Sequence, residues 1–211
     1  MQPANLRPLL PGIIAMGIVV LSSNILVQFP LGAFLTWGAL TYPFAFLTTD
    51  LTNRLQGAAA ARRVVLAGFV VGLLCSLAGT QIVGEFGPLV TFRIALGSGL
   101  AFLLGQMSDV SIFSLLRRDT WWKAPLISTL ISSTLDTIIF FTLAFSAMFA
   151  FLELGIDLSW AVEPAPLLGM GPEFPFWVSL AIGDWMVKIA LALIALIPFR
   201  LVVSRLLPRL A

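Results

Sequence analysis

The chain has 211 residues, of which 59% are hydrophobic and only 10% are charged, and its formal net charge is +2. A soluble domain carries about 25% charged residues, so this composition excludes an ordinary soluble domain and predicts a protein of the lipid bilayer. The chain has no histidine and a single cysteine, Cys75, which excludes histidine-dependent triads, the zinc proteases of the H-E-x-x-H type and an intrachain disulfide framework.

Long apolar stretches predict six transmembrane helices, because a helix of about 20 apolar residues crosses a bilayer core. In chain order they are residues 8–27, 31–49, 64–84, 91–116, 126–151 and 176–199. The longest connection is a loop over residues 152–175, interpreted as a solvated external loop, with a lid over an external vestibule as the alternative. The sequence therefore predicts an all-α integral membrane protein, with residues 1–211 forming a single transmembrane domain.

The placement of charge predicts the orientation of these helices. Positively charged residues are enriched in cytoplasmic connections. Ten of the basic residues fall on one predicted side: Arg7, Arg54, Arg62, Arg63, Arg117, Arg118, Lys123, Arg200, Arg205 and Arg209. The opposite side carries only acids: Glu85, Glu153, Asp157, Glu163 and Glu173. We therefore expect both termini to be cytoplasmic.

Three ionisable residues are expected near the middle of the membrane, where a charge is costly and points to function. At about 1.5 Å of rise per residue, Asp136 lies roughly 15 Å inside the fifth predicted helix, at the level of Asp184 and Lys188 in the sixth. Asp184 and Lys188 are spaced i, i+4, which predicts an ion pair. Asp136 has no cation near it in the sequence, so a direct ligand contact is favoured over a hydrogen bond to neighbouring hydroxyl or backbone groups.

Other polar and aromatic residues sit at informative depths. Thr41, Tyr42 and Pro43 are expected to interrupt the second predicted helix. The interruption either lines a cavity with non-helical backbone or is a simple packing kink. Gln106 and Asp109 lie toward the cytoplasmic end of the fourth predicted helix, with an interfacial Asp109 as one alternative. Near the outer end we place Asn24 and Arg93, the latter expected to snorkel toward water, and near the midplane Phe140 and Trp185, which suit stacking on a flat ligand. The pattern predicts a transporter of a small, flat, polar molecule.

Several runs together resemble the queuosine precursor transporter family, also called the vitamin uptake transporter family. They are residues 23–24 with 27–30, 41–44, 49–54, 93 with 105–106 and 109, 122 with 125 and 128–129, 136–137 with 140–141, and Asp184 with Trp185 and Lys188. The loop over 152–175 is longer than the family pattern, and Trp185 stands where a tyrosine is expected. The resemblance covers about residues 20 to 200.

The resemblance implies import of a 7-deazaguanine base across the bacterial inner membrane: 7-cyano-7-deazaguanine, with the aminomethyl form or queuine as alternatives. Asp136 would then accept the two donors of the guanine-like edge, and Gln106 would address its carbonyl or ring nitrogens. We assign Asn24 or Thr41 to the cyano-bearing side. Tyr42, Phe140 and Trp185 are assigned to stacking, and Asp184 and Lys188 complete the predicted site. Gln28, Arg93 and Asp109 are secondary candidates.

The partners expected are this small molecule and membrane lipid, with a homo-oligomer left open and no nucleic acid, cofactor or metal. Coupling is either facilitated diffusion with intracellular trapping, or proton coupling through Asp136 or the Asp184–Lys188 pair. The main alternative is a substrate-binding subunit of an ATP-driven vitamin importer, which would need partner subunits because this chain has no P-loop. An intramembrane aspartyl enzyme and a ligand-free structural factor are the remaining alternatives, and a non-enzyme is expected.

Overall fold

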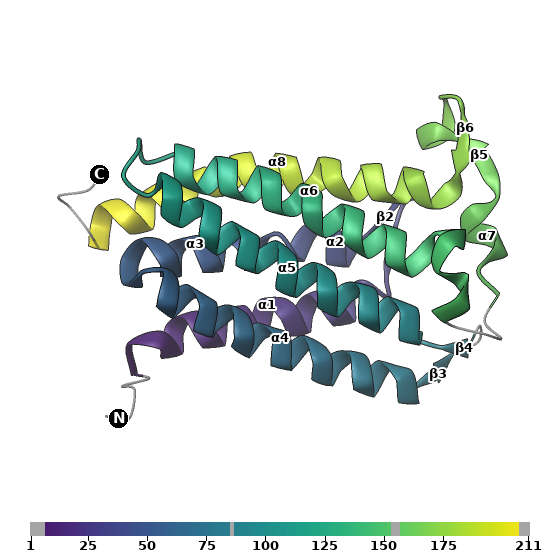
Figure 1. Cartoon of the computed structure of the whole chain (residues 1–211), viewed down its shortest axis with the longest axis horizontal. Coiled ribbons are helices and arrows are strands. Elements are labelled where there is room, and N and C mark those ends of the chain that lie inside the picture. The colour runs from purple at the N-terminus through teal and green to yellow at the C-terminus, as the bar shows by residue number, and fades with distance from the viewer. Residues whose placement is uncertain (1–6, 85–86, 153–156, 207–211) are drawn as a thin grey trace.

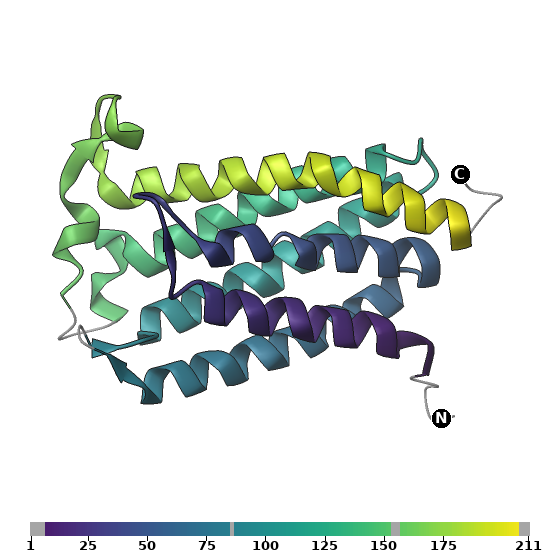
Figure 2. The ribbon, with the colours of Figure 1, turned by 180° about the vertical axis from the view of Figure 1, so that it is seen from behind.

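A computed structural model describes residues 7–84, 87–152 and 157–206. Long helices lie side by side in a bundle, with short hairpins and helical turns at one end (Figures 1 and 2). The elements in chain order are η1 (Arg7–Leu9), α1 (Leu10–Leu26), β1 (Pro30–Leu31), β2 (Leu35–Thr36), α2 (Trp37–Thr41), α3 (Phe44–Gln56), α4 (Ala58–Gln81), β3 (Val83–Gly84), β4 (Gly87–Pro88), α5 (Phe92–Leu116), α6 (Lys123–Phe145), η2 (Ala147–Leu152), α7 (Ser159–Val162), β5 (Pro164–Pro166), η3 (Leu167–Gly169), β6 (Glu173–Pro175) and α8 (Phe176–Leu206).

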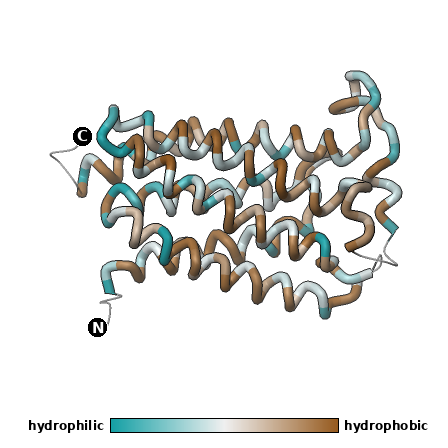
Figure 3. The backbone as a smooth tube through the Cα atoms, viewed as in Figure 1, coloured by the Kyte–Doolittle hydropathy of each residue, from teal (hydrophilic) through white to brown (hydrophobic). Residues whose placement is uncertain are grey.

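Within the described residues, five helical segments are long and apolar enough to cross a membrane: Arg7–Leu26, α4, α5, α6 and α8. Large apolar side chains such as Ile14, Leu74 and Ile197 are exposed on their outer surfaces. Hydrophobic residues run along most of the length of these helices (Figure 3). Such a surface is unfavourable in water and suits lipid, so the prediction of an all-α membrane protein is confirmed.

The predicted helix over residues 31–49 begins later than expected, whereas the interruption predicted at Thr41, Tyr42 and Pro43 is confirmed. Strands β1 and β2 form a short antiparallel hairpin, α2 follows, and the helix is then interrupted at Tyr42 and Pro43 before α3 begins at Phe44. Proline has no backbone N–H to donate to the preceding turn, and its ring clashes with that turn's carbonyl. In the described part of the chain, five long helices are therefore accompanied by one broken segment.

The broken segment nevertheless runs beside the long helices. Figures 1 and 2 show α2 and α3 in succession through the bundle, and the Gln56 side chain at the end of α3 donates a hydrogen bond of 2.9 Å to the Pro8 carbonyl at the start of the first helical segment. Gly57 then reverses the chain into α4 with φ of 90°, a conformation that favours glycine. Helix α3 lies inside the bundle, where lipid does not reach it, and its polar residues Thr49, Asp50 and Asn53 are buried.

Several other boundaries differ from the predicted ones. Helix α4 starts at Ala58 rather than at residue 64, α6 ends at Phe145 because Ser146 is extended, and α8 continues through Pro198 to Leu206. The predicted loop over 152–175 contains α7 and the β5–β6 hairpin. The predicted outer residues Glu85 and Glu153 and the predicted inner residue Arg209 lie outside the described residues.

Two apolar clusters fix the helices around the polar interior. One joins α1, α3, α4 and α5 through residues that include Met16, Val64 and Phe102, and the other joins α5, α6 and α8 through residues that include Phe113 and Phe199. Helices α5 and α6 approach closely at glycines. A Cβ at Gly105 would lie 3.0 Å from the Asp136 Cβ, so α5 lies directly against the residue on which the candidate site is built.

Candidate functional site: a buried ion cluster

Lys188 of α8 lies at the centre of a buried ion cluster that includes two acids. Its Nζ is 2.6 Å from Asp136 Oδ2 on α6 and 2.6 Å from Asp184 Oδ2, one turn earlier on α8. It also donates a hydrogen bond of 3.0 Å to Thr137 Oγ1, which in turn donates to Asp184 at 3.1 Å. An ammonium group has three donors, and each has an acceptor here.

Tyr42 reaches this cluster from the interruption between α2 and α3. Its hydroxyl donates a 2.8 Å hydrogen bond to Asp136 Oδ1, and Lys188 Nζ lies 5.2 Å from the centre of its ring, a distance typical of a cation–π interaction. Three parts of the bundle therefore meet at one point. The break next to Pro43 places a tyrosine side chain there.

Two of the three charged residues in the cluster are buried, and the cluster is unbalanced in charge. Asp136 is 2% exposed and Lys188 is 3% exposed, whereas the Asp184 side chain is 16% exposed. With both acids ionised, two carboxylates and one ammonium leave a net charge of −1. Desolvating such groups costs several kcal/mol per ion, so a buried cluster of this kind is weak evidence for stability and a candidate for function. Its chemistry suits a ligand that offers hydrogen-bond donors or a positive charge.

The structure changes one expectation about these residues and confirms another. The predicted Asp184–Lys188 pair is present, and Asp136 lies beside it as the common depth suggested. Asp136, however, is not without a cation, because the same lysine contacts both acids. The sequence gives the depth of a residue in a helix but not the rotation of that helix against its neighbour, which decides the contact.

Gln106 lies one residue after Gly105, the α5 residue that packs on Asp136. Its Oε1 accepts a 2.6 Å hydrogen bond from Thr49, while its Nε2 is buried and has no hydrogen-bond partner in the described part of the chain. The Asp109 side chain, for which an interfacial position was one alternative, is completely buried between the helices. Both residues face the interior at the cytoplasmic half predicted for α5.

The remaining predicted residues make their contacts elsewhere. Thr41 is 2.9 Å from the Ser23 hydroxyl, and Asn24 donates to the Val20 carbonyl of its own helix. Trp185 is 39% exposed and donates to Thr134, Phe140 packs against Phe141 and Phe145, and Gln28 is exposed. The structure thus brings together Tyr42, Asp136, Asp184 and Lys188.

Arg93 does not snorkel to water. It is 3% exposed, and its guanidinium donates to the carbonyls of Leu143 and Ser146 at 3.0 and 2.7 Å. These carbonyls lie at the C-terminal end of α6, where the last turn has no helical donors and carries partial negative charge. Arg93 therefore caps α6 from α5, which is a structural role.

Sequence reasoning missed the polar residues that surround Asp50. Ser128 and Thr129 of α6 point their hydroxyls at the two oxygens of this buried carboxyl, at 3.4 and 3.3 Å. The sequence spacing could have revealed them. Two rows of polar residues, spaced at i, i+4 and i+8, share one face of α6 and end at the ion cluster. They are Ser128, Ser132 and Asp136, and Thr129, Ser133 and Thr137.

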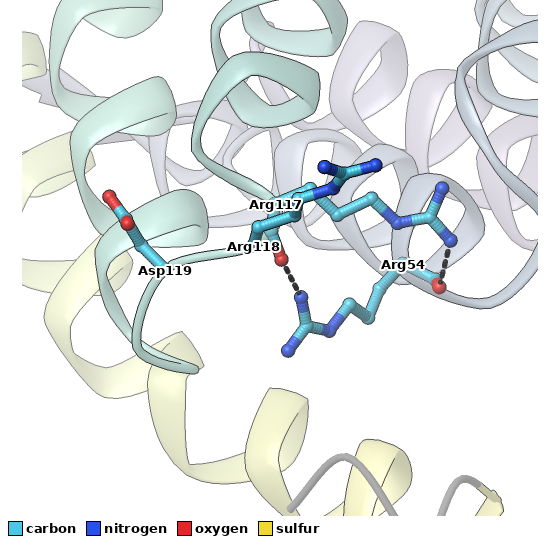
Figure 4. A pocket seen from close by; sticks show the side chains of 4 residues that line it. All are labelled: Arg54, Arg117, Arg118 and Asp119. Atoms are coloured by element: carbon cyan, nitrogen blue, oxygen red, sulfur yellow. Dashed lines mark hydrogen bonds between the residues drawn. The ribbon is translucent and has the colours of Figure 1, made fainter.

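A basic cavity lies at the end of the bundle where α3 and α5 finish. Arg54 donates to the Arg117 carbonyl, and Arg117 donates to the Arg54 carbonyl at 2.8 Å (Figure 4). Arg118 and Asp119 complete the lining of this cavity, which measures about 490 Å³. The reciprocal bonds tie the two helix ends together and gather positive charge at this end.

Apolar helices around a charged interior define a multi-pass membrane protein. A family described as "Putative vitamin uptake transporter" matches residues 36–203. The queuosine precursor transporter of Escherichia coli K12 is 36% identical over 209 residues, covering 92% of this chain and 86% of that protein. A probable queuosine precursor transporter of Haemophilus influenzae is 41% identical over 122 residues, or 52% of each chain.

A probable queuosine precursor transporter of Bacillus subtilis is 29% identical over 193 residues, covering 82% of this chain and 73% of that one. No solved structure gives a significant match. The chain belongs to the queuosine precursor transporter family, for which the vitamin uptake transporter name is also used. The resemblance drawn from the sequence runs is thereby confirmed, and the family is described as one of transporters.

Proposed function

We propose that this protein imports queuosine precursors across the bacterial inner membrane, with 7-cyano-7-deazaguanine as the expected substrate. The aminomethyl form and queuine remain within the proposed class. The observation that carries the proposal is the largely buried cluster of Asp136, Lys188 and Asp184 against Tyr42, with its excess negative charge. The names of the Escherichia coli and Haemophilus influenzae relatives support the same substrate class.

The proposed recognition uses exchange of partners at Asp136. A guanine-like edge presents a ring N–H and an exocyclic amine side by side, and a carboxylate can accept both. Asp136 already accepts from Tyr42 and Lys188, so the substrate's donors replace one or both of them. Asp184 keeps Lys188 neutralised meanwhile. Because Asp184 is the more exposed acid, we assign substrate entry to its side of the cluster.

Because the cluster is largely buried, substrate entry requires α8 or α2 to move relative to α6. Tyr42 sits at the interruption next to Pro43, where the helical hydrogen bonds are already incomplete, so this segment bends at lower cost than a continuous helix. Stacking on the substrate ring is assigned to Tyr42, with Phe140 and Trp185 as further candidates. Asn24, Thr41 and Gln106 keep their proposed polar roles in the open state.

The test is queuosine in tRNA. The protein is expressed in a bacterial strain that neither makes nor imports the precursor, nanomolar 7-cyano-7-deazaguanine is supplied, and modified tRNA is separated on a boronate gel. Wild type should restore modification, and Asp136→Asn should abolish it, because buried donors of the ligand then lose a charged acceptor. Asp157→Asn, which alters an exposed acid, is the matched control. Restoration by Asp136→Asn at normal expression would remove this residue from the site.

Nothing in the comparisons supports the alternative of a substrate-binding subunit for an ATP-driven importer. The two functions differ in their need for partners. Purified protein alone in liposomes should take up substrate if it is a self-sufficient transporter. Uptake that appears only after an ATPase pair is added would favour the alternative.

A further inference from the structure

A second buried acidic pair, distinct from the ion cluster, lies between α3, α5 and α6. The side chains of Asp50 and Asp109 lie next to each other and beside Ser128 and Thr129 of α6, and the two acids are 3% and 0% exposed. All salt bridges found among the described residues involve Lys188, so neither acid has a cation within 4 Å there. Two ionised carboxylates so close together in a dry site repel strongly, and a proton shared between them relieves that repulsion.

The hydrogen bonding around Asp50 and Asp109 also favours a proton in this pair. Asp50 receives the hydroxyls of Ser128 and Thr129, but both oxygens of Asp109 are buried and receive no donor from the described residues. A buried acceptor without a donor is costly and calls for explanation. A single proton on Asp50 supplies the missing donor, as an O–H directed at Asp109.

The surroundings leave space for a proton and little else. The cavity beside Asp50 measures about 10 Å³, no more than a single water needs. Its α8 wall consists of apolar residues, among them Ala192 and Phe199. On α3 the nearest charged residue in sequence is Arg54, which is bonded to a carbonyl of the α5 end. A hydrated cation does not fit beside the pair.

Unsatisfied polar groups mark a route from this pair to the ion cluster. Gln106 Nε2 and Ser132 Oγ are both buried and without a hydrogen-bond partner in the described residues. Gln106 is one turn from Asp109 on α5, and Ser132 is one turn from Asp136 on α6. On the other side, Asn53 bonds Ser114 and the Val110 carbonyl and continues the polar interior toward the basic end.

We propose that Asp50 and Asp109 hold one proton in common and couple solute movement to proton movement. The inference rests on the proposed function for its transport part, whereas the shared proton is a property of the protein alone. During a cycle the O–H bond breaks, the proton passes to water on the inner side, and a proton from the outer side restores the acid. The proton count of the pair is unchanged after each cycle.

The shared proton is tested on purified protein without substrate. A protonated carboxyl group has its own C=O stretching band in the infrared, which shifts in heavy water. Wild type should show this band at neutral pH, Asp50→Asn and Asp109→Asn should lose it, and Asp119→Asn, an exposed acid at the same end, should keep it. Asp109→Glu retains a carboxyl and should retain the band. Absence of the band in wild type overturns the proposal.

Coupling is tested in liposomes with the membrane potential clamped and 7-cyano-7-deazaguanine as the probe. An inward gradient of one pH unit should concentrate substrate about tenfold at one proton per molecule. Asp50→Asn should keep exchange of labelled for unlabelled substrate within about twofold of wild type but lose this accumulation, since an amide cannot release a proton. Gradient-driven accumulation by the Asp50→Asn variant, or accumulation in wild type that follows sodium, overturns the coupling role.

Failure of the proposed import function and failure of the proposed proton coupling give different results. If wild type shows neither exchange nor accumulation, the proposed substrate fails and the coupling role falls with it, whereas the infrared band still decides whether the pair holds a proton. If exchange occurs in wild type without response to the pH gradient, the import function stands and the coupling role is wrong. Variants are compared only after gel filtration in detergent shows the same elution as wild type.

Discussion

Lys188 shows how one side chain can hold an otherwise unfavourable interior together. It neutralises one of two acids, and its three donors all have acceptors, so the cluster has few unsatisfied groups despite its burial. The same arrangement makes the stability of the cluster sensitive to the loss of any one of its charged side chains. Removing the cation leaves two carboxylates in a low-dielectric site, and removing one acid leaves a balanced pair.

Replacing Lys188 with methionine should therefore destabilise the protein by about 3–5 kcal/mol, the usual cost of breaking a buried ion pair. Thermal unfolding in detergent, followed by tryptophan fluorescence, measures the change. Adding Asp136→Asn to the same chain should recover part of the loss, because one uncompensated charge disappears. Arg62→Met, which removes an exposed cation, is the control. An unfolding temperature of Lys188→Met equal to wild type would show that the cluster is not an ion pair in detergent.

At the scale of the elements, the broken segment depends on a close approach between α1 and α2. A Cβ at Gly38 would lie 2.8 Å from the Val27 nitrogen and 2.9 Å from the Ser23 carbonyl oxygen, both backbone atoms that cannot move aside alone. The contact between Ser23 and Thr41 closes the same interface. The position of α2 in turn sets the position of Tyr42 against Asp136.

Gly38→Ala should thus push α2 from α1, at a cost of about 1–3 kcal/mol for overpacking. For a chain of this size each kcal/mol corresponds to roughly 2–4 °C in unfolding temperature. Substrate uptake should fall as well, since Tyr42 moves. Gly17→Ala is a matched control: its added Cβ would meet nothing within 4 Å, and alanine favours helix over glycine. Equal unfolding temperatures for the two variants would contradict the steric argument.

At the scale of the whole molecule, polar and basic groups are distributed along one axis. The ion cluster, the Asp50–Asp109 pair and the Arg54–Arg117 tie follow one another through the polar interior. Figures 1 and 2 show the beginning of the first helical segment and the end of α8 at the same end of the bundle as this tie. The positive-inside rule then predicts that this end faces the cytoplasm.

Single cysteines test this orientation. In a chain carrying Cys75→Ser, the changes Asp119→Cys and Glu163→Cys each place one thiol at an exposed site, the first at the basic end and the second just before the β5–β6 hairpin. A membrane-impermeant maleimide applied to whole cells should label only the second. Permeabilised cells, in which both should react, control for accessibility. The reverse pattern would invert the predicted topology.

The sequence by itself determined the membrane class, the five long helices and the family, because composition and apolar length depend on residues close together in the chain. It also predicted that Asp136, Asp184 and Lys188 lie at one level of the bundle, because helical rise is constant. Only the tertiary structure decided that Lys188 bonds both acids, that Tyr42 reaches Asp136 and that Asp50 meets Asp109. These contacts depend on the rotation of neighbouring helices and on the break at Pro43, which packing between distant segments fixes.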